Sequence, residues 1–302
     1  GRLICLDAKT GKLCHGFGTS GVVNLRAGVA DEFPGAEYAV TSAPAIYKNL
    51  VITGAAVPEY PSKGPSGRVR AFDVHTGQCV WTFHTIPGPG EAGHETWAKE
   101  AWKARTGANV WSTMSVDNER DLIFLPVGSA SYDFYGGDRK GQDLFANSLV
   151  ALQASTGKLL WYFQMVHHDI WDYDMPAQPS LITVQRNGKS IAAVAQVTKM
   201  GFVFIFDRVT GTPLFPVEER VVPKSDVPGE ESWPTQPFPS KPPPLVRQGF
   251  NEGDITTVTP EAHRYCAEWF HSLESRGMYT PYGGKQTLVV PALPFFQRQF
   301  ET

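Results

Sequence analysis

The residues best suited to chemistry in this sequence lie together in one short segment, residues 167–174. It packs five potential metal or proton ligands, two histidines and three aspartates, into eight residues. Such side chains are costly to bury unless they are paired or bind a metal. The segment also contains Trp171 and Tyr173, and it follows an apolar run, residues 159–163, that predicts a strand. The pattern indicates a working pocket. The alternative is a hydrogen-bonded turn between two sheets, since structural ion networks also gather such residues.

A repeated template predicts the elements that must position this segment. Each copy has an apolar run, a polar position, a Thr-Gly pair and further apolar residues, which is typical of a strand, a turn and a return strand. The threonines of the four pairs are Thr10, Thr76, Thr156 and Thr210, so their spacings are 66, 80 and 54 residues. A fixed module with loop insertions of different lengths explains this irregular period.

The aromatic residues of the template refine the prediction of fold class. Two return strands carry a tryptophan four residues after the glycine, Trp81 and Trp161. Hairpins repeated with an aromatic motif favour an all-β fold of the β-propeller type. The alternative is that Asp-x-x-Thr-Gly is only a common hairpin turn, but four copies in matching apolar context argue against it.

Long polar segments separate the repeats. Residues 84–108 are rich in glycine, proline and charge, with one short helical candidate over residues 96–105. Residues 213–248 hold ten prolines and are predicted to form no regular structure, but a lid, an active-site wall or a spacer. A helix is predicted over residues 260–273, with Thr259 as its N-cap before Pro260.

Composition excludes several classes of function. The formal net charge of −3 gives no electrostatic footprint for nucleic acid. No apolar run approaches the roughly 18 residues that a membrane-spanning helix needs. The four cysteines show no CxxC spacing, so a zinc or redox motif is not indicated, and disulfide pairing stays open. The first residue is glycine, and the chain is expected to be a piece of a longer protein.

Several long motifs resemble a known family, the pyrroloquinoline-quinone (PQQ) dependent dehydrogenases, and in particular the quinoprotein glucose dehydrogenase branch. The motifs are Val-His-His-Asp-Ile-Trp-Asp-Tyr-Asp-Met-Pro-Ala-Gln-Pro at residues 166–179, Lys-Met-Gly-Phe-Val-Phe-Ile-Phe-Asp-Arg at 199–208, Pro-Val-Glu-Glu-Arg at 216–220 and Pro-Thr-Gln-Pro-Phe at 234–238. The resemblance implies that residues 1–302 supply about four blades of an eight-bladed β-propeller. It fails near residue 290, so residues 290–302 are expected to be a divergent or truncated tail.

The resemblance also implies roles for individual residues. Asp172 falls on the general base that takes the substrate hydroxyl proton, and Lys199 on the donor to a PQQ carbonyl oxygen. Trp111 falls on the indole that stacks on PQQ, and Thr41 lies near a position that contacts a PQQ carboxylate. His167 and His168 are interpreted as residues that position Asp172. The implied ligands of a Ca²⁺, Mg²⁺ or lanthanide ion are Glu59, Ser129, Ser131, Asp172 and Asp174.

These roles imply a dehydrogenase that oxidises CH–OH groups of an aldose sugar such as glucose, or of an alcohol. A quinone or a cytochrome would accept the electrons. The family resemblance further implies a periplasmic or periplasm-facing location, with membrane association through segments outside this chain. The competing hypotheses are a non-catalytic propeller scaffold and an inactive fragment of such an enzyme. A scaffold has no need of Asp172, Lys199, Glu59 and Trp111 together, and their joint presence favours the enzyme.

Overall fold

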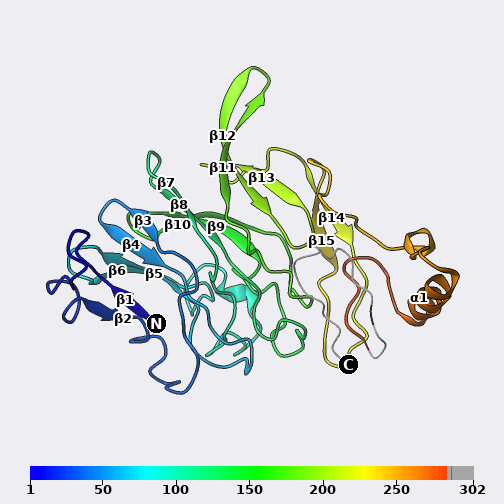
Figure 1. The fold of residues 1–302 in the computed structure, drawn as a ribbon, viewed down its shortest axis with the longest axis horizontal. Helices are drawn as coiled ribbons and strands as arrows, with labels where there is room; N and C mark the ends of the chain where they lie inside the picture. Colours follow the sequence, from blue (N-terminus) through cyan, green and yellow to red (C-terminus); the bar gives the residue numbers. More distant parts are fainter. Residues whose placement is uncertain (284–286, 288–302) are drawn as a thin grey trace.

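Short antiparallel strands are the main regular elements of the described chain (Figure 1). The computed structural model describes residues 1–283 and residue 287, so the predicted tail over residues 290–302 lies outside the described residues. Two sheets have four strands each, in the order in which the strands follow along the chain. The first contains β3 (Ala45–Tyr47), β4 (Leu50–Thr53), β5 (Val69–Asp73) and β6 (Cys79–Phe83). The second contains β7 (Ser115–Asp117), β8 (Leu122–Pro126), β9 (Ser148–Gln153) and β10 (Leu159–Gln164).

Three smaller sheets flank these two. The strands β1 (Arg2–Ile4) and β2 (Val22–Asn24) pair at one end of the molecule. The next sheet after the second four-stranded one has three strands, β11 (Ser180–Arg186), β12 (Lys189–Val197) and β13 (Val203–Asp207). The last pair is β14 (Val217–Val221) and β15 (Thr235–Pro239). The sheets follow one another across the molecule as successive blades, and the chain is a partial, open β-propeller, as predicted (Figure 1).

The Thr-Gly hairpins form as predicted, and the residue at their polar position explains why. The carboxylate of Asp73 accepts hydrogen bonds from the backbone N–H groups of His75 and Thr76 and from the Thr76 hydroxyl. Gly77 then adopts a φ of 73°, a left-handed conformation that glycine takes at little steric cost. In the third copy Gln153 replaces the aspartate and accepts from the Thr156 hydroxyl at 2.9 Å.

The two tryptophans of the template join neighbouring blades. Trp81 donates from Nε1 to the carbonyl of Ala154 at 3.1 Å, and Trp161 donates to the carbonyl of Arg208 at 3.2 Å. Each acceptor lies in the hairpin turn of the next blade. The indole also fills the space beside the glycine of that turn: a Cβ on Gly157 would lie 2.6 Å from Trp81. The repeat motif is therefore a contact between blades as well as a turn within a blade.

The hydrophobic core lies between the blades. Strand β9 is buried along most of its length, including both faces, because blades pack against it on either side. One core cluster joins β5, β8 and β9, and another joins β9 to β13 through Trp161 and Phe206. No helix of the described residues is long and apolar enough to cross a membrane.

Of the two predicted helices, one is confirmed. Helix α1 (Pro260–Ser272) begins after Thr259, whose hydroxyl accepts from the N–H of Ala262 at 3.1 Å. The helix predicted over residues 96–105 is wrong: only the 3-10 turn η1 (His94–Thr96) forms, and the chain is extended at Trp97. Ala104 has a φ of 50°, which a right-handed helix cannot contain.

The prediction that residues 213–248 form no regular structure is also wrong. Strands β14 and β15 pair over five residues each, although β15 contains Pro237 and Pro239. Because these prolines are two residues apart, both missing N–H groups lie on the same side of the strand. The other side keeps its hydrogen-bonding groups for β14, so a proline-rich segment can form an edge strand.

Candidate active site

The predicted site residues lie at one end of the blades. In antiparallel sheets of this order, the starts of odd-numbered strands and the ends of even-numbered strands share one edge. Trp111 precedes β7, Ser129 follows β8, and residues 167–174 follow β10. Lys199 follows β12, so four connections between strands, all at this edge, bring these residues together although they are far apart in the sequence.

Lys199 holds the centre of the cluster. Its Nζ donates to the carbonyl oxygen of Asp172 at 2.8 Å and to the Asp172 carboxylate at 3.0 Å. The Asp174 carboxylate lies 3.7 Å from the same ammonium. Asp172 has a φ of 58°, and its N–H donates to the carbonyl of Asp133 at 3.3 Å. The strained backbone at Asp172 thus turns both its carbonyl and its carboxylate towards one cation.

Asp174 connects this pair to Trp111. One carboxylate oxygen accepts from Trp111 Nε1 at 3.1 Å, and the other accepts from the N–H of Ser129 at 2.5 Å. A side chain on Gly128 would collide with Asp174, because a Cβ there would lie 2.6 Å from its Oδ1. The glycine at this position therefore gives the carboxylate room to reach both donors.

Asp169 organises the segment from within. It is 2% exposed and accepts hydrogen bonds from the Ser129 hydroxyl at 2.5 Å and from Asn147 at 2.8 Å. It also accepts from the N–H groups of Trp171 and Tyr173. With these donors satisfied, Asp169 fixes the turn that presents Asp172 and Asp174.

Burial and mutual repulsion raise the pKa of two carboxyl groups of the cluster, although the Lys199 ammonium lies beside them. Burial, and then the charge of Asp174, raise the pKa of Asp172 to about 8, although Lys199 acts in the opposite direction. Burial, and then the charges of Glu59 and Asp172, raise the pKa of Asp133 to about 9. Burial lowers the pKa of Lys199, but Asp174 and Asp172 outweigh it and raise the pKa above its ordinary value.

Asp133 is a member of this cluster that the sequence analysis missed. Its side chain is buried, and it makes no hydrogen bond or ion pair within the part of the chain that the structure describes. No motif marks it, because it stands in a Tyr-Asp-Phe segment without other ligand residues. Only the fold brings it beside Asp172.

The other predicted ligands are placed less directly. Glu59 is exposed, although its charge acts on Asp133. The hydroxyl of Ser129 is engaged by Asp169, and that of Ser131 accepts from Thr106 at 2.9 Å. Thr41 donates to the carbonyl of Trp111 at 2.8 Å, so in this structure it holds the backbone of Trp111. Their roles as metal or PQQ contacts remain predictions.

The donor atoms around Asp172 are relevant to the predicted cation. Within residues 1–283 and 287, no three His, Cys, Asp or Glu side chains are arranged as a group that could hold a metal ion. The chemistry nevertheless suits a hard cation, because Asp133 is a buried carboxyl without a partner and Asp172 and Asp174 converge on an ammonium.

The two histidines of the segment are held by other residues. His168 contacts the carboxylate of Asp143 at 3.1 Å, and Arg139 pairs with the same carboxylate at 2.7 Å. Arg139 also donates to the carbonyl of Asp169. His167 contacts Gln164 at 2.8 Å and Glu219 at 3.1 Å. Each histidine is therefore held by side chains outside residues 167–174, and a role of either in positioning Asp172 stays a prediction.

Blades arranged in sequence order, with an acidic cluster, a lysine and an indole at one end, define a propeller of the quinoprotein class. The chain belongs to the PQQ-dependent dehydrogenases: residues 1–294 match the family described as the β-propeller domain of glucose, ethanol and alcohol dehydrogenases.

Similar proteins carry related activities in their names. The chain is 38% identical over 295 residues to a quinoprotein glucose dehydrogenase of Gluconobacter oxydans, covering 96% of this chain and 36% of the relative. It is 37% identical to a quinate/shikimate dehydrogenase (quinone) of Acinetobacter baylyi, with the same coverage. The crystal structure of the quinohemoprotein alcohol dehydrogenase of Comamonas testosteroni superimposes with a TM-score of 0.62 at 28% identity, over 79% of this chain and 35% of that one. This chain therefore spans about a third of the length of these relatives.

Proposed function

We propose that the protein carrying this chain is a PQQ- and cation-dependent dehydrogenase that oxidises CH–OH groups of an aldose sugar or an alcohol. The observation that carries the proposal is the Asp172–Lys199–Asp174–Trp111 cluster in a chain of the PQQ family. Glucose, quinate and glycerol dehydrogenases all occur among the relatives, so the family supports the reaction class more strongly than any one substrate.

PQQ, when bound, would accept the electrons of the substrate, and a hard cation beside it would act as a Lewis acid. Trp111 would hold the face of the cofactor, since Asp174 and Thr41 fix its indole and its backbone. Asp172 and Asp174, with Glu59, would supply oxygen ligands to the cation, and the charge of the cation would favour ionisation of the nearby Asp133.

Asp172 is the residue that would move the proton. Its carboxylate is buried, and Lys199 holds it in one orientation, so it can accept the substrate hydroxyl proton at a defined oxygen. Without a cation its raised pKa keeps much of the group protonated at neutral pH. A bound cation would lower that pKa and leave the carboxylate ready to act as base.

A PQQ titration of the chain with Ca²⁺ or La³⁺ present, followed by tryptophan fluorescence, tests the cofactor site separately from turnover. We expect saturable quenching that needs the metal and is lost in Trp111→Ala. Trp269→Phe is the matched control, since Trp269 lies on α1, none of whose residues is buried. Absence of quenching in a folded chain would contradict the proposal and favour a non-catalytic scaffold.

We further propose a quinone as the electron acceptor and a periplasmic or periplasm-facing location. The acceptor is supported by the name of the Acinetobacter relative, a quinone-dependent dehydrogenase. The location rests on the family resemblance alone. Fractionation of cells that express the intact protein tests it, and recovery in the cytoplasm would contradict it.

A further inference from the structure

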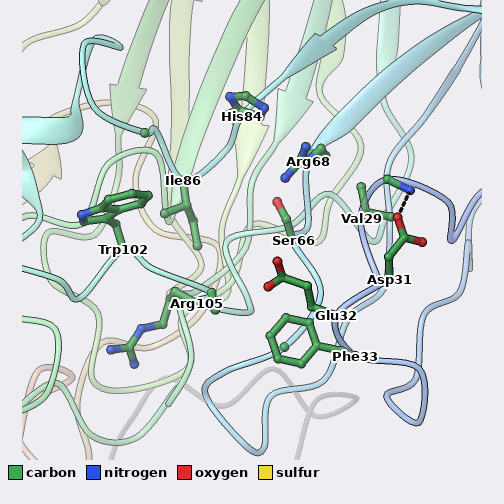
Figure 2. Close-up of a pocket in the computed structure, with 14 residues that line it drawn as sticks. Val29, Asp31, Glu32, Phe33, Ser66, Arg68, His84, Ile86, Trp102 and Arg105 are labelled. Carbon is green, nitrogen blue, oxygen red and sulfur yellow. Dashed lines mark hydrogen bonds between the residues drawn. The ribbon is translucent and has the colours of Figure 1, made fainter.

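A cavity of about 400 Å³ lies at the same end of the sheets as the acidic cluster, because Arg68 immediately precedes β5 and His84 immediately follows β6. Figure 2 shows the residues that line it, among them Val29, Asp31, Glu32 and Phe33 of the loop over residues 28–33, which lies beside Arg68 and Ser66. Its lining includes none of Trp111, Asp172, Asp174 or Lys199.

Arg68 lines the cavity with a positive charge that no ion pair in the described chain balances. Its guanidinium has no hydrogen bond or ion pair within residues 1–283 and 287, and its Nε is buried without a partner. Burial, and then the nearby charge of Arg70, lower the pKa of Arg68, so its charged form is poorly stabilised by the protein. Arg70, by contrast, donates to Tyr38 at 3.1 Å, and Arg105 pairs with Asp138 at 2.8 Å. An arginine half-buried in this way lacks an anion.

Two further polar groups beside Arg68 are also without partners in the described chain. The hydroxyl of Ser66 makes no hydrogen bond, and Figure 2 shows it on the same wall as Arg68. His84 uses Nδ1 to contact Glu91 at 2.7 Å, which leaves Nε2 free. A planar guanidinium with a neighbouring hydroxyl matches the two oxygens of a carboxylate.

Two carboxylates in the lining limit the kind of anion that fits. Figure 2 shows Glu32 next to Ser66, and its exposed carboxylate has no partner among the described residues, while the neighbouring Asp31 accepts from the N–H of Gly28 at 2.8 Å. A doubly charged phosphate or sulfate would therefore be repelled more strongly than a singly charged anion. The carboxylate of Glu32 can also accept hydrogen bonds from hydroxyl groups. Ile86, Phe33 and Trp102 supply the remaining, largely apolar surface.

We propose that this cavity binds a small hydroxylated monocarboxylate, with the carboxylate on Arg68 and Ser66 and the hydroxyl groups towards Glu32. The cavity volume is enough for a molecule of six or so carbons, since ligand pockets of drug-sized molecules begin at roughly 300 Å³. Binding at this site needs neither PQQ nor a cation, so it is independent of the proposed dehydrogenase activity.

Isothermal titration of the 302-residue chain with sodium gluconate, in the absence of PQQ and metal, tests the proposal. We expect saturable binding that is at least tenfold weaker in Arg68→Gln and partly retained in Arg68→Lys. Glucose, which offers the hydroxyl groups without the carboxylate, is expected not to bind. Arg220→Gln is the matched control, because it removes an arginine that pairs with Glu218 on the surface, and it should bind as the unchanged chain does.

Circular dichroism melting of each variant shows whether it is folded, so that lost binding is read only from folded protein. No saturable binding of gluconate to the folded chain would overturn the proposal. Equal binding by the unchanged chain and Arg68→Gln would also overturn it, because the carboxylate would then be held elsewhere.

Discussion

At the scale of single residues, the site depends on the balance between three buried carboxyl groups and one ammonium. Lys199 reaches Asp172 and Asp174 together, while Asp133 stays without a partner. Replacing Asp172 by asparagine removes its charge but keeps its position. Asparagine has the same shape, and one of the hydrogen bonds from Lys199 goes to the backbone carbonyl of residue 172.

We expect Asp172→Asn to lower turnover by at least about 10²-fold while PQQ binding changes little, because a general base contributes about 10²–10⁴ in rate. Steady-state oxidation of glucose or ethanol by the intact protein that contains this chain measures the first effect, and fluorescence titration measures the second. Asp254→Asn, which removes a partly buried partner of the exposed Arg247, is the control. Unchanged turnover in Asp172→Asn would show that another group takes the proton.

The raised pKa values of Asp133 and Asp172 predict that the metal-free chain becomes less stable as pH rises. In the unfolded chain these groups titrate near 3.8, and in the folded chain near 9 and 8. Between those values the folded state binds more protons, so the stability they contribute is present below about pH 4 and is lost as pH rises towards 9.

Thermal unfolding in EDTA from pH 5 to pH 9 measures this slope. Asp133→Asn should flatten it, since the variant has no proton to lose at that position. Added Ca²⁺ or La³⁺ should raise the melting temperature most at the alkaline end. A melting temperature that rises steadily with pH in the metal-free chain would contradict the charge balance described for the site.

The site residues that could be predicted are those that lie within long sequence motifs. Asp172 and Lys199 were predicted because long motifs surround them, and the structure joins them at 3.0 Å. Asp133 and Arg139 were not, because their roles come from folding: one is buried beside Asp172, and the other supports Asp143 and Asp169. Short polar segments carry no periodic signal of such contacts.

At the scale of elements, the Thr-Gly hairpin is determined by two things: the local turn within it and a long-range contact with the preceding blade. Its turn follows from an acceptor side chain and a left-handed glycine, which the sequence displays. Its contact with the tryptophan of the preceding blade depends on blade packing and could not be read from the hairpin alone. The proline-rich strand β15 shows the reverse case, in which tertiary pairing overrides a local signal against regular structure.

Two glycines with nearly the same φ distinguish the backbone strain of the turn from its packing contact with a tryptophan. Gly211 has a φ of 70° and would place a Cβ 2.6 Å from Trp161, whereas Gly188, with a φ of 73°, has open space around it. We expect Gly188→Ala to destabilise the chain by about 1–2 kcal/mol through backbone strain alone. Gly211→Ala should cost about 1–3 kcal/mol more, because it also displaces the indole. Denaturant unfolding measures the free energy of unfolding of both variants. Equal losses of stability would show that the Trp161 indole can move aside at little cost.

At the scale of the whole molecule, the sequence order of the blades places residues that are far apart in the sequence beside one another in one site. The class of fold could be predicted because the hairpin repeats four times, whereas the sheet boundaries and the polar contacts between blades could not. One such contact is the pair of Asp117 and Arg208. Asp117 ends β7 in one blade, and Arg208 follows β13 in the next, with the two side chains 2.8 Å apart and largely buried.

This pair predicts that neighbouring blades unfold together. Arg208 also donates to the carbonyls of Ala193 and Ile182, so it ties its own sheet to β7. Asp117 also pairs with the exposed Arg120 at 3.1 Å, so removing Arg208 weakens the compensation of its buried carboxylate without abolishing it. A buried charge left with no partner costs about 3–5 kcal/mol, so we expect Arg208→Met to lower the stability of the chain by less than that, and Asp117→Leu with Arg208→Met to cost less than the two single changes summed. Arg220→Met, which breaks an exposed pair, should change stability by less than about 1 kcal/mol.

Denaturant unfolding followed by both tryptophan fluorescence and far-ultraviolet circular dichroism measures these losses of stability. If the two signals separate into distinct transitions in the unchanged chain, the blades unfold independently and the pair does not couple them.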